Sequence, residues 1–97
     1  MAELNEVIHQ SARLQIMAAL VAIEPGVEAD FTHLKDLLKL TDGNLGAHLK
    51  KLEDAGYISV NKVFVERKPK TYISATPEGR TVFKDHVAAL QAILKGK

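Results

Sequence analysis

The stretch TDGNLGAHLKKLEDAG, residues 41–56, decides the fold that this sequence predicts. Thr41 suits the N-cap of a helix, and Gly56 suits the left-handed residue that ends one. Between them, leucines recur at helical spacing and form an apolar stripe: Leu45, Leu49 and Leu52. Gly43 and Gly46 weaken the first two turns, since each costs about 1 kcal/mol relative to alanine. We therefore expect a helix that packing holds in place and that stays slim at its leading end.

A shorter helix is predicted just before it, within DFTHLKDLLKL, residues 30–40. Thr32 is the expected N-cap, and Phe31 is expected to form a brief strand ahead of the cap. One face of this helix is apolar and carries Leu34, Leu37 and Leu38. The connection to the next helix, residues 40–43, has the length of the tight corner in a helix-turn-helix. We place that motif at about residues 32–55.

The first helical segment is predicted from about residue 4 to residue 23, where apolar residues recur at three- and four-residue steps. Ser11 is a candidate N-cap, which predicts a break near residues 9–11 and a second helical section after it. Pro25 and Gly26 end the segment, because both residues favour turns.

After residue 56 the pattern changes from a helix to strands. The segments YISVNKVFVE, residues 57–66, and KTYISAT, residues 70–76, are rich in β-branched and aromatic residues. The basic sequence RKP, residues 67–69, lies between them at a predicted turn. We therefore expect a β-hairpin with a basic tip, or wing, at about residues 57–76.

A last helix is predicted at about residues 77–95. It begins in TPEGR, where Thr76 is the N-cap, Pro77 takes the first position and Glu78 lies in the first turn. Its apolar stripe is wide for a chain of 97 residues, which indicates a partner helix.

The order helix, helix, helix, hairpin, helix predicts a mainly α fold with a small β-hairpin (α+β). This is a winged helix-turn-helix with a C-terminal extension helix. The sequence has no internal repeat, low-complexity segment or linker, so we expect a single domain over residues 1–97.

The net charge is only +1 and says little about the function. The distribution of charge along the chain says more. Residues 1–31 hold one basic residue against five acidic ones, whereas residues 32–80 hold nine against six. The basic middle favours a polyanionic partner, with ordinary surface charge as the alternative. The chain has no cysteine, no apolar run long enough to span a bilayer and no signal-peptide pattern, so we expect a cytoplasmic protein without a membrane partner.

The helix within residues 41–56 has the pattern of a helix that reads the major groove. Opposite the leucines lies a face with Asn44, Ala47, His48 and Lys51. Asn44 can pair with the N6 and N7 edge of adenine, and His48 can donate to a base or a phosphate. Lys50 and Lys51 suit phosphates, which fix position without reading sequence. Gly46 allows close approach of the backbone.

Each of these residues also has a plainer interpretation. Asn44 can bond the backbone of the first helical turn, as asparagine often does there. His48 can be a solvated surface residue, and Lys50 and Lys51 can simply aid solubility.

The hairpin provides a second indication of DNA binding. Four basic residues surround its tip, with only Glu66 opposing them: Lys62, Arg67, Lys68 and Lys70. A basic hairpin beside a reading helix can contact phosphates or place arginine in the adjacent minor groove. A solvated charged turn is the alternative, and the pairing of the two elements is more specific than either alone.

The sequence LTDGNLGAHLKKLEDAGYI followed by TPEGR closely resembles the small winged-helix transcriptional regulators related to the MarR and ArsR families. The resemblance extends from SARLQIMAAL through HVAALQAIL. It implies that the major-groove face carries Thr41, Asn44, Gly46, His48 and Lys51, and that Arg67 and Lys68 form the wing tip. It also implies a homodimer that binds a pseudo-palindromic operator, mostly as a repressor, and it leaves a small-molecule effector open.

The resemblance further implies dimerisation through the first and last helices. The residues expected to take part are Leu4, Val7, Ile8, Phe83, Val87, Leu90, Ile93 and Leu94.

Three other functions have weaker support in the sequence. No catalytic triad, phosphate-binding glycine loop, paired-carboxylate motif or cofactor motif stands out, so we expect neither an enzyme nor a cofactor. Metal sensing would need two subunits to pool His86 and Asp85 across a dimer. A winged helix can also serve as a protein-docking module. Such a module would expose apolar residues around the Asn44, His48 and Lys51 face and the hairpin tip, where the sequence is expected to expose none.

Overall fold

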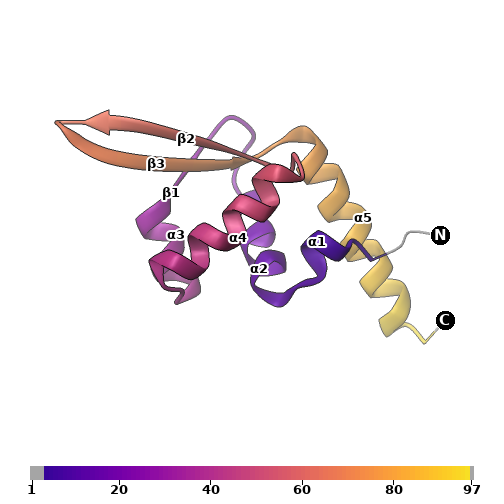
Figure 1. The fold of residues 1–97 in the computed structure, drawn as a ribbon. Helices are drawn as coiled ribbons and strands as arrows, with labels where there is room; N and C mark the ends of the chain where they lie inside the picture. Colours follow the sequence, from indigo (N-terminus) through magenta and orange to yellow (C-terminus); the bar gives the residue numbers. More distant parts are fainter. Residues whose placement is uncertain (1–3, 97) are drawn as a thin grey trace.

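The computed structural model describes residues 4–96. Its elements follow one another as α1 (Glu6–His9), α2 (Ser11–Val21), β1 (Ala29–Asp30), α3 (Phe31–Leu38), α4 (Asp42–Asp54), β2 (Ile58–Val65), β3 (Lys68–Ala75) and α5 (Pro77–Leu94). Figure 1 shows the helices gathered into a body from which β2 and β3 project as a long hairpin. The hairpin tip and the C-terminal end of α5 lie at opposite ends of the molecule, whose extents are 54, 25 and 21 Å.

The first helical segment is broken at Gln10, within the predicted interval 9–11. Ser11 as the cap of the second section was wrong, because Ser11 is already the first residue of α2. The cap is Gln10, whose extended backbone lets its side-chain oxygen accept from two N–H groups of the first turn of α2. Asn5 caps α1 in the same way and was not predicted.

The start of α3 also differs from the prediction. The N-cap is Asp30 rather than Thr32, and the Asp30 carboxylate accepts a hydrogen bond of 2.9 Å from the N–H of Thr32. A carboxylate is further favoured at this position by the positive end of the helix dipole. The brief strand is present but lies at Ala29–Asp30, and Phe31 is the first residue of α3.

The turn between α3 and α4 consists of residues 39–41. Lys39 has a left-handed backbone with φ 56°, so the chain reverses without a glycine. Gly43, which the sequence placed at the boundary between the turn and the helix, lies inside α4. Thr41 is the N-cap as predicted: its Oγ1 accepts from the N–H of Asn44 at 3.1 Å. Gly56 has φ +84° and ends the helix as predicted.

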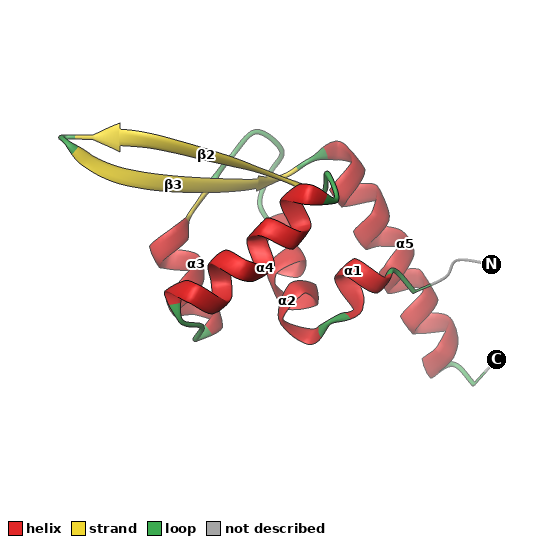
Figure 2. Ribbon diagram, viewed as in Figure 1, coloured by secondary structure: helices red, strands yellow, loops and turns green. Residues whose placement is uncertain are grey.

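The strands form an antiparallel sheet in the order β1-β3-β2, and Figure 2 shows how far the hairpin extends beyond β1. The β2–β3 pairing starts with Ile58 opposite Ala75 and ends with Val65 opposite Lys68. β1 pairs with β3 only near the body, with Ala29 opposite Ile73. The outer half of the hairpin is therefore supported only by its own two strands.

The core lies between the helices and the inner half of the sheet. Its buried members are Ile8, Ile16, Met17, Leu20, Ala29, Leu34, Leu45, Leu49, Leu52, Ile58 and Ile73. The three leucines predicted to fix the 41–56 helix are all among them. The predicted α+β winged helix-turn-helix is confirmed. The single domain was predicted for residues 1–97, of which 1–3 and 97 lie outside the described residues.

The junction between the hairpin and α5 depends on close packing. Thr76 caps α5 as predicted: its hydroxyl donates to the carbonyl of Gly56 at 2.7 Å, and its Oγ1 accepts from the N–H of Gly79 at 2.9 Å. A Cβ added to Gly79 would lie 2.0 Å from the carbonyl oxygen of Tyr57. Only glycine therefore allows α5 to begin this close to the chain after α4.

A polar cluster joins the N-terminal segment to α5. The backbone N–H of Asn5 donates to Nδ1 of His86 at 2.9 Å, and its side-chain amide donates to the Tyr57 hydroxyl at 2.9 Å. His86 is fully buried, so its ring is neutral when Nδ1 accepts this bond. Burial, and to a lesser extent the charge of nearby His9, lowers the pKa of His86 below its ordinary value.

Among residues 4–96, no helix has the length and apolar character needed to cross a membrane.

Candidate nucleic-acid interface

α4 presents a polar face to solvent, opposite its buried leucines. Thr41, Asn44 and Lys51 are exposed, while His48 and Gly46 are partly buried on the flanks of that face. The hydrogen bond of Asn44 in the cap uses its backbone N–H, so the cap does not occupy its side-chain amide. The side chain of Asn44 is therefore exposed and takes no part in the cap.

The charge of α4 is not basic as a whole. Its two lysines face three acidic residues of the same helix, Asp42, Glu53 and Asp54. Lys50 lies 3.6 Å from Asp54 in an exposed ion pair. The helix therefore presents a polar surface with little net attraction for a polyanion.

The leading end of α4 is also tied to α3. Asp42 lies 2.9 Å from Lys35 of α3, and this hydrogen bond together with the charge of Asp42 raises the pKa of Lys35. The contact joins the two helices of the motif across their short turn.

Both glycines of α4 border open space. A Cβ added at Gly43 or Gly46 would have no atom within 4 Å. Packing within the chain therefore does not explain why these positions hold glycine. The space beside Gly46 is available to a partner.

The hairpin turn differs in one detail from the prediction. The two-residue turn is Glu66–Arg67, and Lys68 and Pro69 already belong to β3. Both turn residues have left-handed backbones, with φ 51° and 66°. This is the twist that suits a two-residue hairpin loop, although Asn-Gly is the sequence that usually adopts it. Two non-glycine residues in this conformation store strain at the outermost point of the molecule.

The outer hairpin is both basic and apolar. Its basic residues are Lys62, Arg67, Lys68 and Lys70, and all except the partly buried Lys70 are exposed. Beside them, Phe64 is 78% exposed and Val65 is 44% exposed. The expectation that no exposed apolar residue would lie near the tip was therefore wrong. Phe64 and Val65 are exposed because the outer half of the hairpin extends past the body (Figure 1).

A groove separates α4 from the hairpin. Its volume is about 370 Å³, and its polar lining includes Lys50 and Glu53 from α4 and Lys62 and Thr71 from the hairpin. Gly46 also lines it. The two elements predicted to bind DNA therefore border one hollow, in which two lysines face a single carboxylate.

The residues predicted for dimerisation fall into three groups. Ile8 is fully buried in the core of the chain, so its place in a dimer surface was wrong. Val7 and Phe83 pack partly against the same core. Ile93 and Leu94 are 57% and 85% exposed at the end of α5, and Leu4, Val87 and Leu90 are partly exposed.

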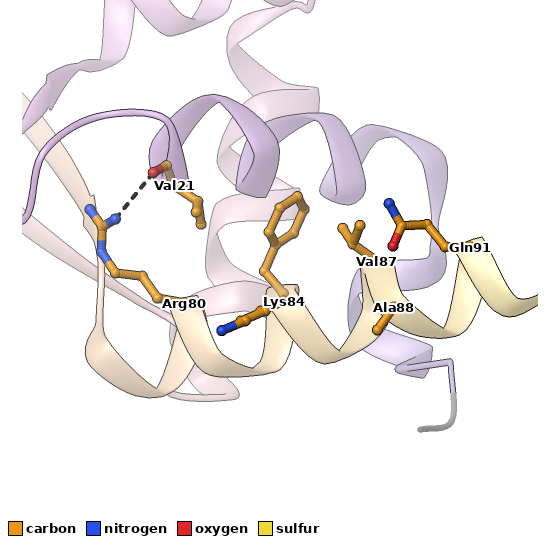
Figure 3. A pocket seen from close by; sticks show the side chains of 7 residues that line it. Val21, Arg80, Lys84, Val87, Ala88 and Gln91 are labelled. Atoms are coloured by element: carbon orange, nitrogen blue, oxygen red, sulfur yellow. Dashed lines mark hydrogen bonds between the residues drawn. The ribbon is translucent and has the colours of Figure 1, made fainter. Parts of the chain in front are cut away.

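A second groove runs along α5 from Arg80 to Gln91, as Figure 3 shows. It has a volume of about 520 Å³ and is lined by Val21, Phe83, Val87 and Ala88, with Arg80, Lys84 and Gln91 around them. Arg80 is held there by hydrogen bonds to the carbonyls of Val21 at 3.1 Å and Ile23 at 2.7 Å. Arg80 thus provides hydrogen-bond donors for the carbonyl groups of Val21, the last residue of α2, and of Ile23 in the loop after it.

The metal alternative is not supported by the placement of its residues. His86 is buried inside the chain, whereas the adjacent Asp85 is exposed, so the two cannot meet a partner subunit together. In the described part of the chain, no group of three or more histidine, aspartate or glutamate side chains is placed to hold a metal ion.

The family model described as Winged helix DNA-binding domain matches residues 12–94. An uncharacterized protein of Methanocaldococcus jannaschii is 36% identical over 90 residues, which cover 93% of this chain and 95% of that protein. The solved structure of a transcriptional regulator homologue from Pyrococcus horikoshii OT3 has a TM-score of 0.84 and 32% identity, over 95% of this chain and 88% of its own.

More distant structures share the fold alone. A MarR-like transcriptional regulator of Thermotoga maritima has a TM-score of 0.66 and 18% identity, over 98% of this chain and 66% of its own. Streptococcus pneumoniae FabT in complex with DNA has a TM-score of 0.56 and 19% identity, over 93% of this chain and 64% of its own. The family match over residues 12–94 shows that the chain belongs to the winged helix DNA-binding domain family.

Proposed function

We propose that this protein is a sequence-specific, double-stranded DNA-binding transcriptional regulator that acts in the cytoplasm as a homodimeric repressor, without catalysis. The observation that carries the proposal is the groove shared by α4 and the hairpin. On α4 the groove is lined by Gly46, Lys50 and Glu53, and on the hairpin by Lys62 and Thr71. Asn44, His48 and Lys51 are not part of this lining and lie on another face of the helix. Family membership and the transcriptional regulator homologue of Pyrococcus horikoshii support the same activity.

In this proposal each element has a separate task. The exposed face of α4 enters the major groove, where Asn44 reads a base, His48 contacts a base or a phosphate, and Lys51 contacts phosphate. The hairpin places Arg67 and Lys68 over the adjacent backbone, with Lys62 and Lys50 at the groove between the two elements. Lys70 contributes its charge from the other face of the hairpin. Thr41 and Gly46 let the leading end of the helix approach the duplex closely.

The homodimer is proposed from the unburied apolar surface of α5. Ile93 and Leu94 are largely exposed, and the groove lined by Phe83 and Val87 lies on the same helix. Leu4, Val7 and Leu90 add to this surface. A two-fold dimer would set two copies of α4 about 34 Å apart, facing successive major grooves of a pseudo-palindromic operator.

Selection of bound sequences from a pool of random duplexes tests the proposal directly. We expect enrichment of an inverted repeat whose half-sites lie about one helical turn apart. Recovery of no preferred sequence would overturn sequence-specific binding. It would favour the docking-module alternative, for which the exposed Phe64 and Val65 are the supporting observation.

Sedimentation of an Ile93→Glu/Leu94→Glu variant tests the dimer. We expect the unmodified protein to sediment as a dimer at micromolar concentration and the variant as a folded monomer. Val27→Glu is the matched control, because Val27 is 50% exposed but lies in the loop before β1. If the unmodified protein sediments as a monomer, the proposed dimer is contradicted.

A further inference from the structure

Phe64 is the outermost large apolar side chain on the inner face of the hairpin. Side chains alternate along a strand, so Ile58, Val60, Lys62 and Phe64 share one face of β2. The first two pack on the body, Lys62 borders the groove against α4, and Phe64 is 78% exposed beyond it. Pro69 stands directly opposite Phe64 on β3 and is also exposed. The side chains on this face of β2 therefore begin in the core, at Ile58, and end at an exposed aromatic ring, Phe64, which lies opposite Pro69.

The surroundings of this ring are cationic. Lys62 is two positions away on the same face, and the tip carries Arg67 and Lys68, with Lys70 one position beyond Pro69. Glu66 is the one acidic residue of the hairpin strands and turn. A partner for this tip must therefore offer both an anionic rim and an apolar or stackable interior. The minor groove of a duplex has both properties, since phosphates line its edges and sugars and base edges form its interior.

The position of Phe64 relative to α4 favours DNA over other anionic partners. The groove between α4 and the hairpin is lined on one side by Gly46 and Lys50 and on the other by Lys62 and Thr71. Phe64 and Pro69 are the next residue pair outward on the face that lines this groove. In the proposed complex α4 lies in the major groove, so the hairpin beside it extends towards the adjacent minor groove, with Phe64 nearer the tip than the residues that line the groove.

We propose that Phe64, backed by Pro69, is an apolar wedge that enters this minor groove, partly unstacks one base step and bends the operator. The inference rests on the proposed function and adds a residue that determines specificity without a hydrogen bond to a base. Wedges of this kind kink a duplex by roughly 20–90°. Pyrimidine–purine steps such as TA and CA deform most readily, so a preference for them arises at the wedge position.

The test compares Phe64→Ala with two controls on the duplex enriched by selection. Val27→Ala removes another exposed apolar side chain away from the hairpin, and Arg67→Ala removes a tip cation while it keeps the ring. Bending is measured by energy transfer between dyes at the two ends of the duplex. Unstacking is measured by the fluorescence of 2-aminopurine at the expected step. Phe64→Leu keeps a wedge of reduced size and should keep part of the bend.

We expect Phe64→Ala to lose the bend, the 2-aminopurine signal and the preference for a pyrimidine–purine step. Its affinity should fall about tenfold, with an unchanged salt dependence. Arg67→Ala should keep the bend and reduce the salt dependence, and Val27→Ala should behave as the unmodified protein. If Phe64→Ala bends the duplex as strongly as the unmodified protein does, the wedge proposal is overturned.

The outcomes also separate the wedge from the proposed function. If the unmodified protein binds its selected duplex without bending it, the wedge fails and the regulator stands. If the unmodified protein binds no duplex, both fail. Binding to anionic phospholipid vesicles that depends on Phe64, in a protein that does not bend DNA, would assign the tip to a membrane surface and overturn the wedge.

Discussion

The helix α4 borders a groove with the middle of the β2–β3 hairpin, and the outer half of that hairpin extends beyond the groove. The helix and the outer half of the hairpin are built in opposite ways. α4 has three fully or almost fully buried leucines, capped ends and more acidic than basic residues. The outer hairpin has four basic residues against one acidic residue, exposed apolar side chains and a strained turn. The difference shows that packing and positive charge are assigned to different elements. The core fixes α4, which offers a defined surface, whereas the outer hairpin carries the positive charge that can attract a polyanion.

This separation matters because the two kinds of contact with DNA have different requirements. Reading a base edge needs a side chain held within about 0.5 Å of its place, which a helix packed on a core provides. Attraction to phosphates needs charge and reach, and it tolerates a flexible support. Variants that affect stability should therefore fall in α4, and variants that affect salt-dependent affinity should fall in the hairpin.

The largest expected effect breaks the anchoring side of the comparison. Leu52→Ala removes a side chain that is fully buried beneath α4, so the free energy of unfolding should fall by about 2–5 kcal/mol. Phe64→Ala, which removes an exposed ring, should change it by no more than about 0.5 kcal/mol. Urea denaturation measures both. Equal losses in the two variants would mean that the outer hairpin belongs to the core.

The next effect separates affinity from stability within the hairpin turn. Arg67→Gly relieves a left-handed residue, so the free energy of unfolding should rise by about 0.5–1 kcal/mol, while affinity for DNA falls about tenfold. Thermal unfolding and fluorescence anisotropy measure the two changes.

Glu66→Gly is the matched control for this variant. It relieves the neighbouring left-handed residue but removes a negative charge, so it should stabilise the protein and bind DNA more tightly. Weaker binding by both variants would show that the shape of the turn matters and its charge does not.

A smaller effect tests the slim leading end of α4. Gly46→Ala meets no atom within 4 Å, so helix propensity should raise the free energy of unfolding by about 0.5–1 kcal/mol. The added methyl group borders the groove, so affinity for DNA should fall despite the gain in stability. A stabilised variant with full affinity would mean that glycine is only tolerated at this position.

The smallest effect concerns a residue outside both regions. The pKa of His86 is lowered in the folded chain, so the unfolded chain binds a proton first and stability declines as pH falls towards 6.5, the ordinary value, and below it. Near neutral pH only the start of this titration is seen, which keeps the change small. Urea denaturation between pH 8 and pH 6 should show the decline in the unmodified protein and a flatter profile in His86→Gln. An unchanged slope in the variant would contradict the assignment.

Most of the fold could be predicted because its signals are local. Thr41 and Thr76 were identified as caps because each stands alone before a clear helical pattern. The caps at Gln10 and Asp30 were missed because a serine or threonine nearby satisfied the same rule. The exact turn was missed because Glu66–Arg67 lacks the Asn-Gly signal of such turns.

The rest depends on contacts between distant segments, which spacing does not show. In the sequence Gly79 looks like an ordinary residue of a helix start. In the structure the carbonyl of Tyr57 leaves no room for a Cβ at this position, so only glycine fits. Ile8 matched an apolar surface stripe and proved to be core. Phe64 alternates as a buried strand residue should, and only the length of the hairpin beyond the body leaves it exposed.

The most direct test of the division between α4 and the hairpin is equilibrium binding across a range of salt concentrations. It compares the selected duplex with a scrambled one, using Asn44→Ala and Arg67→Ala/Lys68→Ala. The hairpin variant should weaken binding to both duplexes equally and reduce the slope of log affinity against log salt by about 2. Asn44→Ala should keep the slope and narrow the gap between the two duplexes. An unchanged slope in the hairpin variant, or equal weakening on both duplexes by Asn44→Ala, would contradict the account.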